Sequence, residues 1–403
     1  MRGCGSGAQA TAAIGGIVAS MTFVACMAFM AAATAGEERS PAGPPTNPPA
    51  EVVAKLLGPM VPVGRDTAAF DAVLLEKGKA IADAFPGKPT ADLSGDGRID
   101  VGDYLFYDLP LVLYRIAFRT DDPAWRDEAR EAARAWRDHP GNRKLGRYLA
   151  GDWTVWKELN HQPRCFGTLG LAILALEADD AEARQVVNDQ ARLIDTVWMH
   201  GPHQSLTDPV MPLGDPRECG YALMALTAAT VLGDDHSQAA RELLDAILAK
   251  QQPDGQWLSK DEKFAGGGYT SNFMTGILNE ALVFYDRALG DARIAPAIEK
   301  NLAWTYRTQW VEAERGFKYH SAGTADEMKV DGVLGGLMVQ AWGYAYAKTG
   351  KAEYLDQGTE IMAGVTGRGF EEIWGPKQYC QVFRSSPMFF GHVHAARQRA
   401  ARP

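Results

Sequence analysis

Residues 92–104 form a segment whose side chains could bind a divalent cation. Its sequence is DLSGDGRIDVGDY, in which oxygen-bearing side chains alternate before a glycine, Gly97. Ca²⁺ prefers about six to eight oxygen ligands, and carboxylates that alternate around a turn glycine can supply them. The segment therefore predicts a calcium site, with an Asp/Gly turn that binds no metal as the alternative. The side chains concerned are Asp92, Ser94, Asp96, Asp100 and Asp103.

This segment resembles the EF-hand calcium loop and the dockerin variant of it. The resemblance implies that these five side chains are ligands and that Arg98 contributes its backbone carbonyl oxygen. EF-hands usually have a bidentate glutamate at the position of Asp103. Dockerins also have Asp at this position, so Ca²⁺ binding is expected, but weaker than in an EF-hand. A dockerin carries two such loops in tandem and this chain has one, so no cohesin partner is expected. Helices expected at about 67–85 and 104–118 indicate a structural rather than a signalling Ca²⁺ site.

A second set of polar residues lies around the starts of apolar segments and suits a sugar-binding cleft. Histidine, tyrosine, arginine, asparagine and carboxylate side chains converge there with aromatic rings. The residues expected to act in catalysis are His161, Tyr319, His320, Arg384, Glu218 and Asp331. Those expected to bind the substrate are Asn160, Arg217, Tyr269, Asn272 and Tyr379.

Two reaction classes fit these residue types. In a uronate polysaccharide lyase, arginine or asparagine neutralises the substrate carboxylate, and tyrosine or histidine removes the C5 proton and protonates the leaving oxygen. A glycoside hydrolase needs two carboxyl groups about 5–9.5 Å apart, and Glu218 and Asp331 could form that pair. Local structural roles are the alternative, because Asp331 and Asn272 are ordinary helix N-caps and Arg217 could simply pair with Glu218.

Five short polar breaks divide the chain at intervals of about 55–60 residues. Each follows an apolar, helix-like segment and precedes a more amphipathic one, with apolar residues at the i, i+3, i+4, i+7 spacing of helices. A helix that is apolar all round is buried, and an amphipathic helix covers it. The repeat is therefore a helical hairpin, and further helices at 67–85 and 386–400 bring the total to six of each kind. The breaks lie at residues 120–122, 178–180, 233–235, 290–291 and 350–351.

This periodicity over residues 65–403 resembles the all-α (α/α)6 toroids, also called six-hairpin proteins, which include secreted carbohydrate-active enzymes. The resemblance implies about twelve helices in an inner and an outer ring, with all long connections at one end; a flat α-solenoid is the alternative. Residues 252–257, QPDGQW, fit the Q-x-x-G-x-W motif of terpenoid cyclases and related toroids, although an ordinary loop also explains them. Long loops in compact domains usually carry function. The long connections are expected at about 86–103, 138–164, 200–217, 252–271, 310–330 and 368–385.

Two other toroid chemistries are disfavoured by the sequence. The zinc-dependent lanthionine cyclases and protein prenyltransferases have Cys-His pairing motifs that this chain lacks, although Cys165, Cys219 and Cys380 lie near expected inner-helix starts. A terpenoid cyclase would carry a DDxxD or DxDD motif, and neither occurs. The three cysteines are compatible with one disulfide and a free thiol, or with three buried thiols.

The N-terminal residues 1–35 have the pattern of a secretory signal peptide. Arg2 is their only charged residue, residues 14–33 are apolar, and Ala33-Thr34-Ala35 fits an A-x-A cleavage site. We therefore expect a secreted or periplasmic protein with no stable membrane span after cleavage; a membrane anchor is the alternative. Residues 36–64 are expected to be a Pro-rich linker and N-terminal extension, followed by the toroid domain at 65–403 with its calcium loop at 92–103.

The charge pattern bears on which kinds of partner the chain can bind. The chain has 41 basic and 50 acidic residues, a net charge of −9, and no basic block, which argues against nucleic-acid binding. The combined features predict a secreted calcium-binding protein that acts as a polysaccharide lyase or glycoside hydrolase on a polysaccharide or oligosaccharide at the long-loop end of the toroid. The alternative is a non-catalytic secreted calcium-binding protein that binds a glycan or a partner.

The calcium site yields the first prediction. The protein is expected to bind one Ca²⁺, so EDTA should lower its melting temperature because binding stabilises the folded state by mass action. The double variant Asp92→Ala/Asp96→Ala should lose this sensitivity to EDTA. A wild-type protein whose melting temperature ignores EDTA, together with calorimetry that detects no calcium binding, would exclude the site.

Overall fold

The computed structural model describes residues 49–84, 107–159, 162–201, 205–259 and 268–401. Residues 45–403 form one compact unit, and the following concerns that unit alone. The expected signal peptide at 1–35 and the calcium loop at 92–103 lie outside the described residues, as do residues 36–48 of the expected linker and extension.

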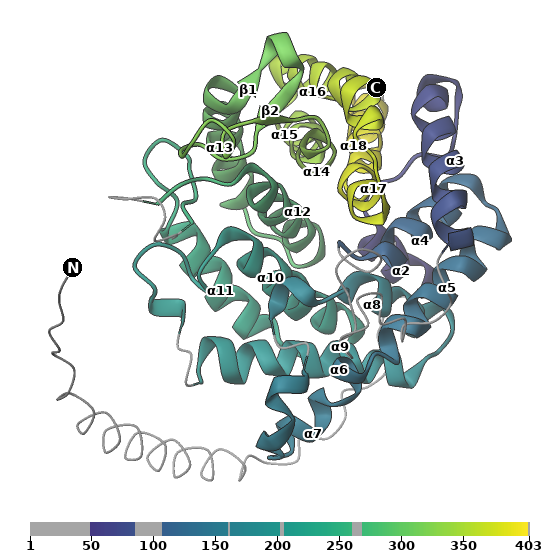
Figure 1. The fold of residues 1–403 in the computed structure, drawn as a ribbon, viewed down its shortest axis with the longest axis vertical. Coiled ribbons are helices and arrows are strands. Elements are labelled where there is room, and N and C mark those ends of the chain that lie inside the picture. The colour runs from purple at the N-terminus through teal and green to yellow at the C-terminus, as the bar shows by residue number, and fades with distance from the viewer. Residues whose placement is uncertain (1–48, 85–106, 160–161, 202–204, 260–267, 402–403) are drawn as a thin grey trace, which may run out of the picture. The chain divides into compact units, whose positions relative to one another are not determined.

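The unit is built on a ring of inner helical segments (Figure 1). Neighbouring segments contact one another in chain order, and α17 also contacts α4 and α3, so the ring closes. Closure excludes the flat solenoid and confirms the expected (α/α)6 toroid. The inner segments are α4 (Leu109–Thr120), α8 (Thr168–Glu177), α10 (Pro216–Leu232), α12 (Asn272–Ala288), α14 with α15 (Leu334–Met338, Gln340–Thr349) and α17 with α18 (Pro376–Phe383, Ser386–Ala400).

An outer layer of amphipathic helices covers the inner ring (Figure 1). Helix α9, for example, buries Val186, Val187 and Leu193 on one side and leaves charged residues on the other, which is why it lies outside. The outer helices are α3 (Ala68–Ala84), α5 (Pro123–Arg137), α9 (Ala181–Leu193), α11 (Ser237–Ala249), α13 (Ile294–Gln309) and α16 (Ala352–Gly364).

The polar breaks form the tight turns between inner and outer helices. Asp122 and Asp180 are N-caps whose side chains accept hydrogen bonds from Ala124 N at 2.9 Å and Ala183 N at 2.8 Å. Gly233 ends α10 with φ of +103°, a left-handed conformation that glycine adopts without a Cβ clash. N-caps and left-handed residues are sufficient to form these short inner-to-outer turns. The additional structure therefore lies in the longer outer-to-inner connections at the other end of the ring.

The long connections contain short helices and a small antiparallel sheet. Strands β1 (Trp310–Val311), β2 (Gly316–Lys318) and β3 (Val330–Asp331) pair in that order, with Phe317 opposite Asp331. This sheet fixes Tyr319 and Asp331 at the entrance to α14. The short helices of these connections are α6 (Pro140–Arg143), α7 (Leu145–Leu149) and the 3₁₀ turns η2 (Trp153–Glu158), η3 (Pro163–Cys165), η5 (Ser205–Thr207) and η6 (Glu312–Glu314). The π-helical turns η4 (Ile194–Met199) and η7 (Val365–Gly369) follow α9 and α16, and the 3₁₀ turn η1 (Arg65–Thr67) precedes α3.

An additional helix, α2 (Pro49–Leu57), packs against the inner helices α4, α8, α10 and α12. It lies within the range expected to be a linker and extension, and the sequence analysis did not foresee it. Arg115 Nε donates to Leu57 O at 2.9 Å, and Arg287 Nη1, in the last turn of α12, donates to Lys55 O at 3.2 Å. Helix α2 therefore covers the tight-turn end of the ring.

The QPDGQW segment is a structural turn that follows α11 and packs between the outer helices α11 and α13. Trp257 is fully buried, and its Nε1 donates to Ile247 O at 3.0 Å. Gly255 has φ of +110°, and a Cβ there would lie 2.3 Å from Lys300 O, so only glycine fits. The ordinary-loop explanation of this motif therefore accounts for it.

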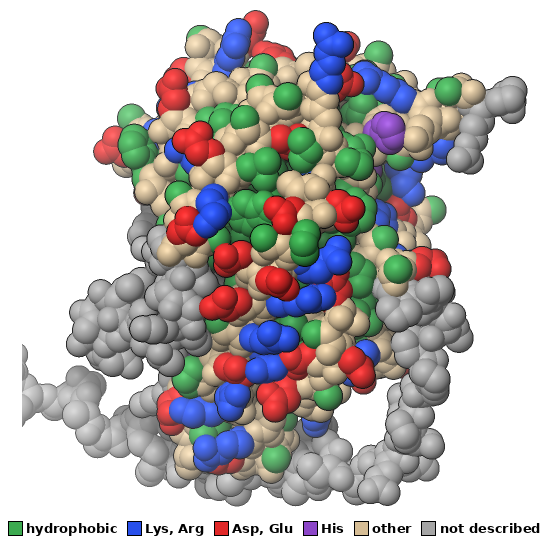
Figure 2. All heavy atoms as spheres, turned by 90° about the vertical axis from the view of Figure 1, so that its right-hand side faces the viewer, with side chains coloured by type: hydrophobic (Ala, Val, Ile, Leu, Met, Phe, Trp, Pro, Cys, Tyr) green, Lys and Arg blue, Asp and Glu red, His purple; other side chains and the backbone are tan. Residues whose placement is uncertain are grey.

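Three further findings concern the described surface, the cysteines and the helices. On the face that carries α3 and α5, basic and acidic side chains are interleaved rather than separated by sign (Figure 2), which does not suit a nucleic-acid backbone. Cys165, Cys219 and Cys380 are free thiols. Among the described residues, no helix combines the length and apolar character needed to cross a membrane.

A fully buried ion cluster joins three inner segments at the centre of the ring. Glu280 of α12 accepts hydrogen bonds from Arg384 Nε at 2.7 Å, from Ser385 Oγ at 2.8 Å and from both terminal nitrogens of Arg115 at 3.3 Å. Burial alone would raise the pKa of Glu280, but Arg384 and Arg115 outweigh it and lower the pKa. The carboxylate is therefore held in its charged form between two cations.

The second prediction follows from this cluster. Glu280→Gln should lower the free energy of unfolding by about 3–5 kcal/mol, because it leaves two buried guanidinium groups without a counter-charge. Urea denaturation would measure the loss. The matched control is Asp83→Asn, which removes the exposed Lys79–Asp83 ion pair and should cost less than about 1 kcal/mol. Equal midpoints for Glu280→Gln and the wild type would show that the cluster does not hold the ring together.

Candidate functional site

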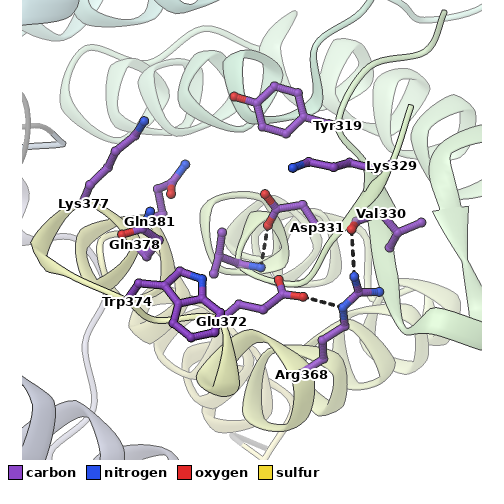
Figure 3. A pocket seen from close by; sticks show the side chains of 11 residues that line it. Tyr319, Lys329, Val330, Asp331, Arg368, Glu372, Trp374, Lys377, Gln378 and Gln381 are labelled. Atoms are coloured by element: carbon purple, nitrogen blue, oxygen red, sulfur yellow. Dashed lines mark hydrogen bonds and ion pairs between the residues drawn. The ribbon is translucent and has the colours of Figure 1, made fainter. Parts of the chain in front are cut away.

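The inner segments α8, α10, α12, α14 and α17 all begin at the end of the ring where the long connections lie. Between β3, η7 and the start of α17, this end contains a cavity of about 390 Å³, which we call the mouth pocket (Figure 3). Its size is at the lower end of the range for small-ligand sites. It is lined by Tyr319, Lys329, Val330, Asp331, Val333, Arg368, Glu372, Trp374, Lys377, Gln378 and Gln381.

Two carboxyl groups lie in the mouth pocket, those of Asp331 and Glu372. Asp331 Oδ1 accepts a hydrogen bond from Val333 N at 2.9 Å, and Glu372 Oε2 accepts one from Gly332 N at 2.7 Å. Burial raises the pKa of Asp331, and the charge of Glu372 raises it further, against the opposing effect of the hydrogen bond from Val333 N. Two carboxyl groups with different environments in one pocket can serve as an acid and a base.

The basic residues of the pocket have different roles. Arg368 is committed to structure, because its guanidinium donates to Glu372 at 2.6 Å, to Glu314 at 2.8 Å and to Val330 O at 2.9 Å. Lys329 and Lys377 also line the pocket, and Figure 3 shows the ammonium group of Lys329 directed toward the space beside the Asp331 carboxylate, with Lys377 at the opposite edge. The pocket can therefore offer positive charge to a ligand that bears a carboxylate or sulfate group.

Tyr319 forms the inner boundary of the mouth pocket. Its ring lies 5.2 Å from the ring of Phe273 and 4.7 Å from that of His320, measured between centroids. Burial raises the pKa of Tyr319, and Asp331 raises it further, while Arg217 lowers it. Tyr319 therefore stays protonated and can donate a hydrogen bond, but it is a poor proton acceptor.

Below the pocket, Tyr107, Arg217 and Tyr221 form a polar floor. Gln381 Nε2 donates to Tyr107 Oη at 3.2 Å, which links the pocket to the floor. Arg217 lies over the Phe273 ring at 5.7 Å and donates to Asp215 at 3.3 Å. Among the described residues, Arg217 Nε and Tyr221 Oη have no hydrogen-bond partner. The floor therefore contains buried donors whose hydrogen-bonding capacity is not used within the described residues.

The backbone at the floor is strained. Tyr107 and Asp108 both have positive φ, +66° and +60°, which costs free energy for residues other than glycine. The contacts of Asp108 hold this conformation, because its carboxylate accepts from Leu111 N at 3.3 Å and from Gly170 N at 3.2 Å. Burial raises the pKa of Asp108. Such strain persists where surrounding structure fixes it, and it often marks functional sites.

Glu218 lies apart from the mouth pocket. It accepts hydrogen bonds from Arg164 N at 2.8 Å and Arg164 Nη1 at 2.7 Å, and it is 5% exposed. Burial raises its pKa, and Asp215 adds to this effect. Its ion-pair partner is thus Arg164, whereas Arg217 pairs with Asp215. Of the carboxyl pair expected from the sequence, Asp331 lines the mouth pocket and Glu218 does not; Glu372 is the second carboxyl group there.

Three residues expected in the site face the interior instead. Arg384 is fully buried in the ion cluster with Glu280. Tyr379 is fully buried, and its hydroxyl donates to Leu74 O of α3 at 2.8 Å. Asn272 is fully buried, and its Nδ2 donates to Lys318 O. The expectation that these three side chains contact substrate at the mouth is wrong, because their polar atoms connect elements of the fold.

The structure places the other expected residues as follows. His320 packs between Tyr319 and Tyr269, with the Tyr269 ring 4.9 Å away and nearly perpendicular. Tyr269 itself is buried. Asn160 and His161 lie outside the described residues, as do the calcium-loop positions Asp92, Ser94, Asp96, Arg98, Asp100 and Asp103. Within the described ranges, no cluster of three or more His, Cys, Asp or Glu side chains is arranged to hold a metal ion.

The sequence analysis missed several lining residues of the pocket. Glu372, Trp374 and Lys377 lie in the connection 368–385, and Lys329 lies in the connection 310–330, both of which were expected to carry function. No spacing or motif in these connections singles out one carboxylate or one tryptophan. Their importance follows only from the folding of the two connections against each other.

Comparisons with known proteins agree with the fold. The unsaturated glucuronyl hydrolase from Bacillus sp. GL1, described as responsible for the degradation of glycosaminoglycan, gives a TM-score of 0.52 at 13% identity, over 83% of this chain and 96% of its own. An unsaturated glucuronyl hydrolase specific for heparin gives a TM-score of 0.52 at 11% identity, over 87% of this chain and 98% of its own. At such identities the likeness is one of fold. No protein-family model and no curated protein matches the chain.

The third prediction concerns Asp331. Since its pKa is raised in the folded state, the folded protein retains a proton that the unfolded chain releases above about pH 4. This contribution to stability is lost as the pH rises through the folded-state pKa. Asp331→Asn, which keeps the acceptor for Val333 N, should therefore gain stability relative to the wild type as the pH rises.

Urea denaturation at a series of pH values from about 4 to 8 would test this expectation. Asp326→Asn, at an exposed position on the same connection, is the matched control and should show no such trend. A constant difference in unfolding free energy between Asp331→Asn and the wild type would mean that Asp331 titrates normally.

Proposed function

We propose that this chain is a carbohydrate-active enzyme that hydrolyses a glycosidic bond in an acidic oligosaccharide at the mouth pocket. The observation that carries the proposal is the presence of two carboxyl groups, Asp331 and Glu372, in one pocket at the long-loop end, where burial raises the pKa of Asp331. Paired carboxyl groups are the usual machinery of glycoside hydrolysis. The fold shared with two unsaturated glucuronyl hydrolases supports this class of reaction.

The proposed mechanism assigns a role to each carboxyl group. Asp331 in its protonated form donates a proton to the glycosidic oxygen as the bond from that oxygen to the anomeric carbon breaks. Glu372, held as an ion pair with Arg368, takes the proton of the attacking water or stabilises the positive charge that develops on the sugar ring. Tyr319 donates a hydrogen bond to the substrate from the inner side of the pocket.

The preference for an acidic substrate follows from the open side of the pocket. Lys329 and Lys377 line it, and Glu372 is paired with Arg368. A carboxylate or sulfate on the sugar would offset these charges, and a neutral sugar would not.

A lyase is the second candidate reaction, because Tyr319 and Arg217 could serve as proton acceptor and carboxylate clamp. The raised pKa of Tyr319 argues against that role, since elimination needs the deprotonated hydroxyl as the base. The hydrolase is therefore preferred. We also propose secretion and a structural Ca²⁺ at residues 92–103, on the sequence evidence alone.

The fourth prediction tests the hydrolase. Wild-type protein incubated with a panel of uronate-containing oligosaccharides should release reducing ends without the ultraviolet absorbance of a newly formed unsaturated product. Asp331→Asn should lower turnover by about 10²–10⁴-fold, the usual contribution of a general acid. Its melting temperature should not fall below that of the wild type, so that the lost turnover does not reflect unfolding.

Asp326→Asn is again the matched control and should retain full activity. A rise in ultraviolet absorbance would assign the lyase instead. Saturable binding of the oligosaccharides without turnover would indicate the non-catalytic glycan-binding protein.

A further inference from the structure

Trp374 is unusual among the tryptophans of this chain. Its side chain is 79% exposed, whereas Trp136, Trp257 and Trp342 are almost completely buried. A large aromatic ring left in water forgoes the free energy of burial, so an exposed indole in a folded protein commonly serves a ligand or partner. The surroundings of Trp374 indicate which kind of ligand it could contact.

The location of Trp374 points to a small-molecule ligand. It lines the mouth pocket together with Lys377, Gln378 and Gln381. Figure 3 shows the indole at the edge of the pocket, beside Glu372 and on the same side as the two glutamines. Glutamine amides both donate and accept hydrogen bonds. An apolar ring next to such amides matches a sugar, which has an apolar C–H face and a rim of hydroxyl groups.

The backbone around Trp374 is anchored on both sides. Ile373 is buried, and Pro376 is the first residue of α17. Glu372 is held by hydrogen bonds from Gly332 N and Arg368 Nε. An indole on a fixed backbone loses little conformational freedom when a ligand stacks on it, so most of the contact energy is available for binding.

We propose that Trp374 is a stacking platform for the second sugar ring of a bound oligosaccharide, while the first ring occupies the mouth pocket beside Asp331 and Glu372. This inference rests on the proposed function and extends it to substrate length. The exposed edge of the pocket, where the indole lies, is the direction in which a chain that enters with its terminal sugar must leave. The preferred substrate therefore has at least two sugar units, and the bond cleaved lies between the pocket and the platform.

The experiment compares two probes on the full-length protein. One is a uronate-containing disaccharide or tetrasaccharide, and the other is the methyl glycoside of the same terminal sugar, which has no second ring to stack on Trp374. Trp374→Ala should raise KM for the oligosaccharide by about tenfold or more, the scale of losing a large aromatic contact. Its kcat should change little, and KM for the methyl glycoside should stay the same.

Matched variants separate stacking from other effects. Trp374→Phe should keep most of the affinity for the oligosaccharide, and Trp374→Leu, which is apolar but not aromatic, should not. Trp153→Ala removes another exposed tryptophan, 41% exposed and not among the residues that line the pocket, and should leave both KM values unchanged. The quenching or shift of tryptophan fluorescence on oligosaccharide binding should be largely lost in Trp374→Phe.

The outcomes distinguish the platform from the proposed function. If the wild type cleaves the oligosaccharide and Trp374→Ala does so with the same KM, the platform is excluded and the hydrolase stands. The same holds if KM rises equally for both probes, or if Trp374→Leu equals Trp374→Phe. A change in sedimentation of Trp374→Ala with unchanged KM would assign the indole to a contact between copies and also exclude the platform. If the wild type neither binds nor cleaves any member of the panel, both proposals fail.

Discussion

The ring depends on one buried carboxylate. Glu280 lies on α12, and its partners Arg115 and Arg384 lie on α4 and at the end of α17. An uncompensated charge in such an environment would cost several kcal/mol, so each of these inner segments must be in place before the others are stable there. The cluster therefore acts as a specificity constraint: among compact arrangements of the same helices, it favours the one in which these three segments meet at the axis.

The same cluster decides where a ligand can bind. The ion pairs fill the centre of the ring, and α2 covers the tight-turn end, with Arg115 and Arg287 donating to its backbone. Among the described residues, the mouth pocket lies at the other, long-loop end. There the floor of Tyr107, Arg217 and Tyr221 separates the buried ion cluster from the mouth pocket, and Gln381 connects floor and pocket. The mouth pocket thus lies above a buried, charged core.

The pocket combines groups from two connections that differ in character. The sheet of β1, β2 and β3 fixes Tyr319 and Asp331 by backbone pairing, and the approach to α17 contributes Glu372, Trp374 and Lys377. The hydrogen bond from Gly332 N to Glu372 joins the two connections directly. This contact is why Glu372 affects the pKa of Asp331, and it makes the acid pair a property of the assembled loops rather than of either one.

The sequence by itself determined the helical hairpin repeat, because caps, left-handed glycines and 3.6-residue apolar periodicity are local features. It also predicted a site at the long connections and named Tyr319 and Asp331 for it, two residues that line the mouth pocket. The sequence could not show how far from the mouth a residue of an inner helix lies, or toward which neighbouring helix its side chain points. Arg384 follows Gln381 by three residues, about 4.5 Å along the axis, and only the packing around Glu280 shows that Arg384 lies below the floor. Tyr379 and Gln381 are two residues apart and face opposite sides, one toward α3 and one toward the mouth, which depends on where the neighbouring helices stand.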